Sequence, residues 1–198
     1  ITEILAEIFK KADIEEIDKL CYLILGNLAP PYRGVEFNLA EKMMIRVLGQ
    51  AFGVSVEEVK ESFGQKGDLG LVAEELAQEN EEKRESSLTV TELYEKFWEI
   101  ALEAGEGSQE RKIKKMVSLL KLLSPLEARF FTRIPLGRLR LGFSETTLLD
   151  ALSWFISGDK RWREEIEAAY SRRADIGFIA KRVKEKGIRG LAGVKIIL

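Results

Sequence analysis

Two arginines set between two glycines are the residues of this chain whose types and spacing best suit ligand chemistry. Arg138 and Arg140 lie between Gly137 and Gly142. Glycine lets the backbone adopt conformations that other residues avoid, and a guanidinium presents a planar fork of donors that matches phosphate oxygens. The spacing therefore predicts a loop that contacts a polyanion.

The residues that follow this loop predict the start of a helix. Ser144 can cap a helix that continues through Leu148, Leu149 and Leu152. Free amide groups and the positive end of the helix dipole would then face the same polyanion. On the other side of the loop, Pro135 should end or kink the preceding helix.

A second glycine-rich segment, G-E-G-S-Q-E-R-K at 105–112, predicts a further phosphate site. Its Gly107 is followed by Ser108, which can act as a helix cap. The cations that come next are Arg111, Lys112, Lys114 and Lys115. Positive charge at a helix N-terminus favours phosphate. The alternative is a simple connection between helices.

The motif P-P-Y-R-G at 30–34 predicts a turn, because its two prolines must end the helix before it. Arg33 and Gly34 could contact a nucleic-acid backbone there, or the turn could be purely structural.

Hydrophobic spacing predicts helix almost throughout the chain, so the expected fold class is all-α. Helix starts are predicted at Ser55 with Glu58 and at Ser124 with Pro125 and Glu127. Residues of helical periodicity include Ile14, Ile17, Leu20, Cys21 and Ile24; Leu93, Phe97 and Ile100; and Ile113, Val117, Leu120 and Leu123.

An internal repeat emerges when the chain is compared with itself at an offset of 107 residues. E-E-V-K-E-S-F at 57–63 then matches E-E-I-E-A-A-Y at 164–170, and D-L-G-L-V-A at 68–73 matches D-I-G-F-I-A at 175–180. The aspartates that open the second pair, Asp68 and Asp175, are predicted to cap helices. The glycines that follow, Gly70 and Gly177, are predicted to allow close helix packing.

Further upstream, 38–41 matches 143–145 with a small shift. The repeat then extends over about 13–80 and 124–187, and predicts two pseudo-symmetric helical subdomains that form one domain and can present equivalent loops to both sides of a duplex.

The formal net charge of −2 hides an uneven distribution along the chain. Residues 1–100 carry 11 Lys+Arg and 21 Asp+Glu, net −10, whereas residues 101–198 carry 20 and 12, net +8. A cationic half suits counterion release at a phosphate backbone. The alternative is that these cations only solvate helix faces.

Several other chemistries find no support in the residues. The chain has no His, and its one cysteine, Cys21, lies in an apolar run and is expected to pack in the core. No zinc-ligand spacing, Walker motif, secretory signal or membrane-length apolar stretch is present, so we predict no metal site, no membrane contact and a cytoplasmic (nucleoid-associated) or nuclear setting.

Four motifs in order give this chain its family resemblance. They are L-A-P-P-Y-R-G-V-E at 28–36, K-G-D-L-G-L-V-A at 66–73, the 105–112 segment, and L-G-R-L-R-L-G-F-S-E-T-T-L-L-D-A-L at 136–152. Together they resemble the N-terminal DNA-binding domain of ATP-dependent DNA ligases of archaeal and eukaryotic type. The resemblance covers nearly the whole chain, with the domain expected over 1–191 and a connection to the adenylation domain over 192–198.

The resemblance implies sequence-independent binding of nicked double-stranded DNA through phosphate and minor-groove contacts, beside the adenylation and OB-fold domains. The complete enzyme is implied to use ATP and Mg²⁺ in DNA replication, repair and recombination. This fragment should bind neither and should lack adenylation activity. Lys66-Gly67-Asp68 is followed by Leu69 where the K-x-D-G motif requires glycine.

Two points stay open. The competing hypothesis is a helical protein-interaction scaffold with an apolar groove. A sliding clamp is a further family partner, but the acidic stretch at 78–87 lacks the paired aromatics of a clamp-binding peptide.

Abundant Glu, Lys and Arg residues suggest a thermophilic source.

Overall fold

The computed structural model describes residues 1–80, 88–142 and 144–196, and this part of the chain is helical and without strands. The prediction of an all-α fold is confirmed. None of the described helices is both long and apolar enough to cross a membrane. The α-helices are α1 (Thr2–Lys11), α2 (Ile17–Ile24), α3 (Glu41–Phe52), α4 (Val56–Lys66), α5 (Leu69–Glu79), α6 (Val90–Ala101), α7 (Ser108–Leu120), α8 (Pro125–Arg133), α9 (Glu145–Ser157), α10 (Arg163–Arg172) and α11 (Ile176–Lys186), with short 3₁₀ helices η1 (Pro31–Arg33) and η2 (Gly187–Leu191).

The helix starts follow the local sequence closely. Ser55 forms a capping box with Glu58, whose amide lies 3.2 Å from the Ser55 hydroxyl. Ser124 and Glu127 form another, with the Ser124 amide 2.8 Å from the Glu127 carboxylate. Reciprocal hydrogen bonds of this kind satisfy amides that a helix leaves unpaired at its N-terminus. Both predicted starts are confirmed.

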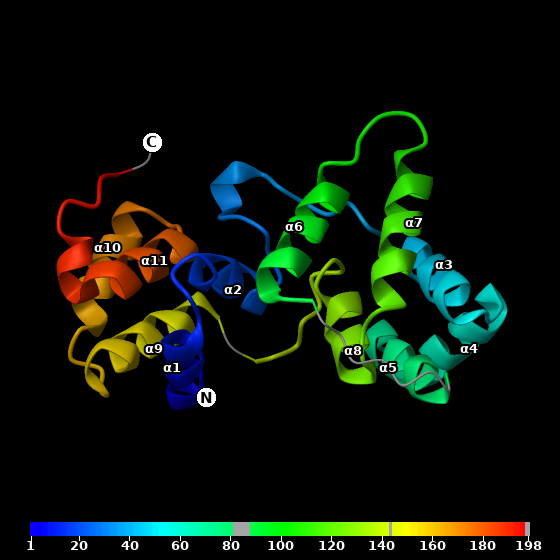
Figure 1. Ribbon diagram of the computed structural model, residues 1–198, viewed down its shortest axis with the longest axis horizontal. Helices are drawn as coiled ribbons and strands as arrows, with labels where there is room; N and C mark the ends of the chain where they lie inside the picture. The colour runs from blue at the N-terminus through cyan, green and yellow to red at the C-terminus, as the bar shows by residue number, and fades with distance from the viewer. Residues whose placement is uncertain (81–87, 143, 197–198) are drawn as a thin grey trace. The chain divides into compact units, whose positions relative to one another are not determined.

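The chain divides into two compact units. Unit 1 consists of residues 1–35 and 140–198, and unit 2 of residues 36–139. Unit 1 therefore holds α1, α2, α9, α10 and α11, while unit 2 holds α3 to α8 (Figure 1).

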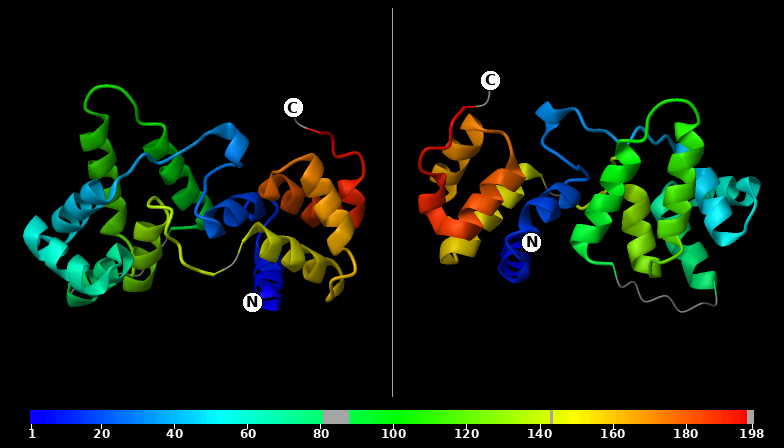
Figure 2. Two further views of the ribbon diagram at one scale, coloured as in Figure 1. Left: turned by 180° about the vertical axis from the view of Figure 1, so that it is seen from behind. Right: turned by 45° about the horizontal axis from the view of Figure 1, so that its top comes forward.

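In unit 1, α2 packs along α11 and α1 packs along α9, as both views of Figure 2 show. Helix α10 closes the unit against α9 and α11. The interior contains Phe9, Ile17, Cys21, Leu148 and Ile179, each essentially inaccessible to solvent. The predicted core position of Cys21 is confirmed, and burial raises the pKa of its thiol above the usual range.

Unit 2 is built in the same manner from different segments. Helix α8 packs along α5, α7 packs along α3, and α4 lies against α3 and α5. Phe97 of α6 stacks on Phe131 of α8 with ring centroids 5.0 Å apart, and Met44 and Met116 complete this core.

The packing partners show that each unit combines pieces of both predicted repeats. Helix α2 belongs to the first repeat but packs on α11 of the second, while α8 of the second repeat packs on α5 of the first. We call α2 and α8 exchanged helices, because each packs on the other repeat. The same exchange includes α1 and α7, which precede the first and second repeats and pack on α9 and α3, respectively. Sequence similarity at a fixed offset identifies equivalent helices but not which copy each one contacts. The repeat boundaries themselves stay a prediction.

The two exchanged interfaces use equivalent glycines. A Cβ atom added to Gly70 of α5 would lie 2.8 Å from the Arg129 carbonyl oxygen of α8. One added to Gly177 of α11 would collide with the Tyr22 ring of α2. The predicted close-packing role of both glycines is confirmed.

The exchange also redistributes charge. Unit 1 carries 16 Lys+Arg and 14 Asp+Glu, and unit 2 carries 15 and 19. Expecting a cationic half from the linear sequence is therefore wrong for the folded chain, because basic α7 and α8 share a unit with acidic α4, α5 and α6.

Candidate nucleic-acid interface

Gly137 reverses the chain at the end of α8. Its φ of +63° lies in the left-handed region, its amide donates to the Ile134 carbonyl (3.0 Å), and the Arg138 amide donates to the Arg133 carbonyl (3.0 Å). This pair of bonds is the Schellman arrangement, which glycine favours because it has no Cβ. The predicted turn after Pro135 is confirmed, and the turn presents Arg138 at the surface.

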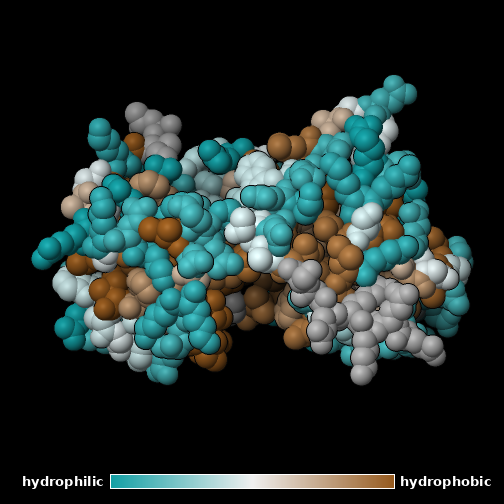
Figure 3. Space-filling model, in the orientation of Figure 1, coloured by the Kyte–Doolittle hydropathy of each residue, from teal (hydrophilic) through white to brown (hydrophobic). Residues whose placement is uncertain are grey.

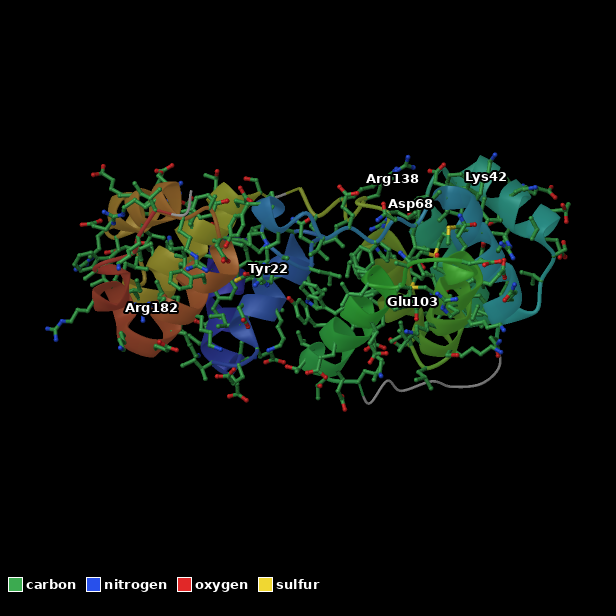
Figure 4. All side chains as sticks on the ribbon, turned by 90° about the horizontal axis from the view of Figure 1, so that it is seen from above. Tyr22, Lys42, Asp68, Glu103, Arg138 and Arg182 are labelled. Atoms are coloured by element: carbon green, nitrogen blue, oxygen red, sulfur yellow. The ribbon has the colours of Figure 1, made fainter. Side chains whose placement is uncertain are left out.

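Arg138 has an exposed side chain that pairs with the first turn of α3. Its Nη1 lies 2.5 Å from the Glu41 Oε1 atom, and half of the side chain is exposed. Figure 4 shows Arg138 and Lys42 along the same edge of unit 2. Helix α3 begins after Ala40, whose methyl group cannot cap the free amides of the first turn. The amides, Arg138 and Lys42 together form a cationic edge with one carboxylate.

The second arginine of the motif belongs to unit 1. Arg140 is exposed and has a φ of +53°, which is uncommon for a residue other than glycine. Gly142 is also exposed and has a φ of +73°. The neighbouring Phe143, part of the F-S-E match, lies outside the described residues. Ser144 is confirmed as the N-cap of α9, and its amide donates to the Thr147 hydroxyl at 3.3 Å.

The P-P-Y-R-G motif forms η1 in unit 1. Its Arg33 is exposed, and Gly34 ends the short helix with a φ of +60°. The structure thus confirms a turn at this motif and places the Arg33 side chain at the surface. Whether Arg33 and Gly34 contact DNA stays a prediction.

The Arg33 and Arg138 turns occupy equivalent positions of the repeat. Pro30 and Arg33 have the same spacing as Pro135 and Arg138, at an offset of 105 residues. Each turn follows an exchanged helix, α2 in unit 1 and α8 in unit 2. Each unit therefore carries one exposed arginine at the same place in its architecture.

A buried aspartate lies behind the Arg33 turn. Asp175 caps α11 through the Phe178 amide (2.9 Å), as predicted, and also accepts hydrogen bonds from the hydroxyls of Tyr22 (2.5 Å) and Tyr32 (2.9 Å). Burial raises the pKa of the Asp175 carboxyl, but these donors and Arg173 outweigh it, so the pKa lies below its ordinary value.

A second buried aspartate lies behind the Arg138 turn. Asp68 caps α5 through the Gly70 amide (2.8 Å) and accepts from Arg133 at 2.7 and 3.2 Å. Burial raises the pKa of the Asp68 carboxyl, but the hydrogen bonds from Arg133 and the Gly70 amide lower it by more. The pKa therefore lies below its ordinary value. The capping role predicted for Asp68 is confirmed.

The 105–112 segment differs from its prediction. Gly107, with a φ of +71°, is the N-cap of α7, and Ser108 is the first helical residue, so the cap prediction for Ser108 is wrong. Arg111 folds back onto its own loop and pairs with Glu103 at 2.7 Å, and Lys115 pairs with the same carboxylate at 2.6 Å. The hydrogen bonds from Lys115 and Arg111 lower the pKa of Glu103. The Glu103 carboxylate thus offsets the positive charge of Arg111 and Lys115, which the sequence predicted to be available for phosphate.

Lys112 faces the interior of unit 2. Only 5% of the residue is exposed, and its Nζ donates to the Phe37 carbonyl at 2.7 Å. Burial lowers the pKa of this ammonium group. The Lys112 side chain is therefore not available to a phosphate. Instead, its hydrogen bond links α7 to the segment before α3.

Unit 2 also has an apolar groove with a volume of about 240 Å³. Its lining residues come from α6, α8 and the segments beside them and include Leu93, Leu123, Phe130 and the exposed Leu126. Figure 3 shows hydrophobic side chains at the surface over these helices.

The residues that hold the two turns are distant in sequence and were not predicted. Tyr22 and Tyr32 bind Asp175, and Glu41 pairs with Arg138, over separations of 153, 143 and 97 residues. The only local signal was the position of Tyr32 between proline and arginine in P-P-Y-R-G.

Taken together, the fold and this site define a class: an all-helical domain with exposed arginines in two equivalent turns. A sequence model of the family described as DNA ligase N terminus matches residues 1–153. The chain belongs to this family, and the resemblance of its motifs is confirmed.

Relatives named as DNA ligases match almost all of the chain. It is 43% identical over 192 residues to a probable DNA ligase of Aquifex aeolicus, covering 97% of this chain and 33% of the relative. It is 40% identical over 205 residues to DNA ligase 2 of Thermofilum pendens (99% and 34%) and 41% identical over 210 residues to a DNA ligase of Sulfurisphaera tokodaii (98% and 34%). The chain thus spans about a third of these relatives.

Proposed function

We propose that this chain binds nicked double-stranded DNA independently of base sequence, through phosphate and minor-groove contacts, as the DNA-binding domain of a nick-sealing ligase. The observation that carries the proposal is the pair of exposed arginines, Arg33 and Arg138, at equivalent turns of the two units. Arg140, Gly142 and Ser144 extend the proposed contact surface in unit 1.

Phosphate and sugar contacts suit this task, because an enzyme that seals breaks in any sequence needs position rather than base identity. Arg138 already pairs with a carboxylate oxygen, whose charge and geometry are close to those of a phosphate oxygen. DNA would therefore displace Glu41 from an existing ion pair rather than order a free side chain.

The complete protein is proposed to use ATP and Mg²⁺, held by adenylation and OB-fold domains outside this chain, in replication, repair and recombination. Its setting would be the cytoplasm or the nucleus. The acidic segment considered for a sliding clamp includes residues 81–87, which lie outside the described residues.

The test is a titration of the chain with nicked and intact duplexes at several salt concentrations. About six phosphate contacts predict a slope of log affinity against log salt near −5. The double variant R33A/R138A should flatten the slope by about 2, since each lost phosphate contact removes about 0.9. The control is K10A/K60A, which removes one exposed cation from a helix of each unit, α1 and α4, that contributes no residue to either turn.

Equal slopes for the two double variants would place Arg33 and Arg138 outside the interface. Circular dichroism establishes that each variant is folded.

The competing function, a protein-interaction scaffold, rests on the apolar groove lined by Leu93, Phe130 and Leu126. A scaffold predicts weak duplex binding with no preference for a nick, so the same titration separates the two functions.

A further inference from the structure

The Arg33 turn is tied to the rest of unit 1 by its neighbour Tyr32. The Tyr32 hydroxyl donates to the Asp175 Oδ2 atom at 2.9 Å, although 48% of the residue is exposed to solvent. Pro30 and Pro31 restrict the backbone before it, and Gly34 reverses the chain after it. The hydroxyl contact therefore fixes the outer end of a short, stiff turn.

Asp175 is suited to act as an anchor. It is 4% exposed, and its two carboxylate oxygens accept from Tyr22, Tyr32, Arg173 and the Phe178 amide. These bonds hold the carboxylate in one orientation, because movement would break several of them at once. Tyr32 thus binds a group whose position is set by the core of α11 and α2.

We propose that Tyr32 and Asp175 are positioning residues for Arg33, and that they preorganise the turn for a phosphate. The inference rests on the proposed DNA binding. Without the Tyr32 hydroxyl, the turn keeps its prolines but loses its hydrogen bond to the buried Asp175 carboxylate. Arg33 must then be ordered on binding, and the cost appears as lost affinity.

Unit 2 contains the same device built from different residues. Its N-cap aspartate, Asp68, binds the Arg133 guanidinium at 2.7 Å. The Arg133 carbonyl accepts the amide of Arg138 at 3.0 Å. In each unit a buried N-cap aspartate holds the turn that follows an exchanged helix, through tyrosine in unit 1 and through arginine in unit 2.

The decisive experiment is a double-mutant cycle between Y32F and R33A, read as affinity for a nicked duplex. Y32F should weaken binding roughly fivefold, the factor that corresponds to about one ordinary hydrogen bond. In the R33A background the same substitution should cause almost no further loss, because the side chain that it positions is absent.

The matched control is Y94F, which removes a tyrosine hydroxyl from α6 of unit 2. Thermal unfolding separates positioning from general stability, because Tyr32 is half-exposed and Y32F should melt close to the wild-type chain.

Three results would overturn the inference. An equal loss from Y32F with and without Arg33 would show that the hydroxyl acts independently of the arginine. A loss that tracks a lowered melting temperature would make Tyr32 merely structural. If R33A weakened binding and Y32F did not, the proposed DNA binding would stand, and only the role of Tyr32 in positioning Arg33 would be refuted. A wild-type chain that fails to bind duplex would instead refute the proposed function on which the inference rests.

Discussion

Replacing Gly70 with alanine tests whether α5 and α8 pack as the structure describes. The added Cβ would lie 2.8 Å from the Arg129 carbonyl oxygen and 2.8 Å from the Cγ and Nε atoms of Arg133. The backbone oxygen cannot move without shifting α8, and Arg133 cannot move without disturbing its buried pair with Asp68, at 2.7 Å. The substitution therefore strains both the helix contact and the ion pair.

The competing contributions can be weighed. Alanine in place of glycine favours the helix by about 1 kcal/mol. Overpacking costs about 1–3 kcal/mol, and full rupture of a buried ion pair costs about 3–5 kcal/mol. With the Asp68–Arg133 pair weakened but not lost, we expect Gly70→Ala to lower the free energy of unfolding by about 2–4 kcal/mol.

The assay is urea unfolding followed by far-ultraviolet circular dichroism. The matched control is Gly64→Ala in α4, where the new Cβ meets nothing within 4 Å and should stabilise the chain by about 0.5–1 kcal/mol. Opposite signs for the two variants are the expected result. If Gly70→Ala were as stable as Gly64→Ala, the close approach of α5 and α8 would be wrong.

Three further outcomes are expected. Glu41→Gln should tighten duplex binding roughly two- to fivefold, because it frees Arg138 from a half-exposed ion pair of modest strength. Weaker binding would contradict the idea that the Glu41 carboxylate competes with phosphate for Arg138. The depressed pKa values of Asp68 and Asp175 contribute stability that is present above the ordinary aspartate pKa and is lost as pH falls through the folded-state values. The urea midpoint should therefore decline below about pH 4, and a midpoint that rose on acidification would have the wrong sign. Lys112→Met should cost about 1–3 kcal/mol in urea unfolding and leave the salt slope of DNA binding unchanged; a slope smaller by about 1 would show that this ammonium reaches a phosphate.

Local sequence determined the helical character of the chain and several of its helix starts with little help from the rest of the chain. The capping residues Ser55, Ser124, Asp68 and Asp175 were readable because an N-cap bonds to amides only two or three residues away. The glycine turn at Gly137 was readable for the same reason, since its hydrogen bonds span five residues or fewer.

Tertiary structure alone decided which helices share a unit and which cations remain available to a ligand. The repeat made α2 and α8 equivalent, yet packing placed each against the other copy. Lys112 and Arg138 are both basic residues near predicted loops, but one is buried on a carbonyl and the other half-exposed at the surface. Burial and charge pairing depend on residues as far as 153 positions apart or more, and a linear pattern carries no record of which distant residues meet.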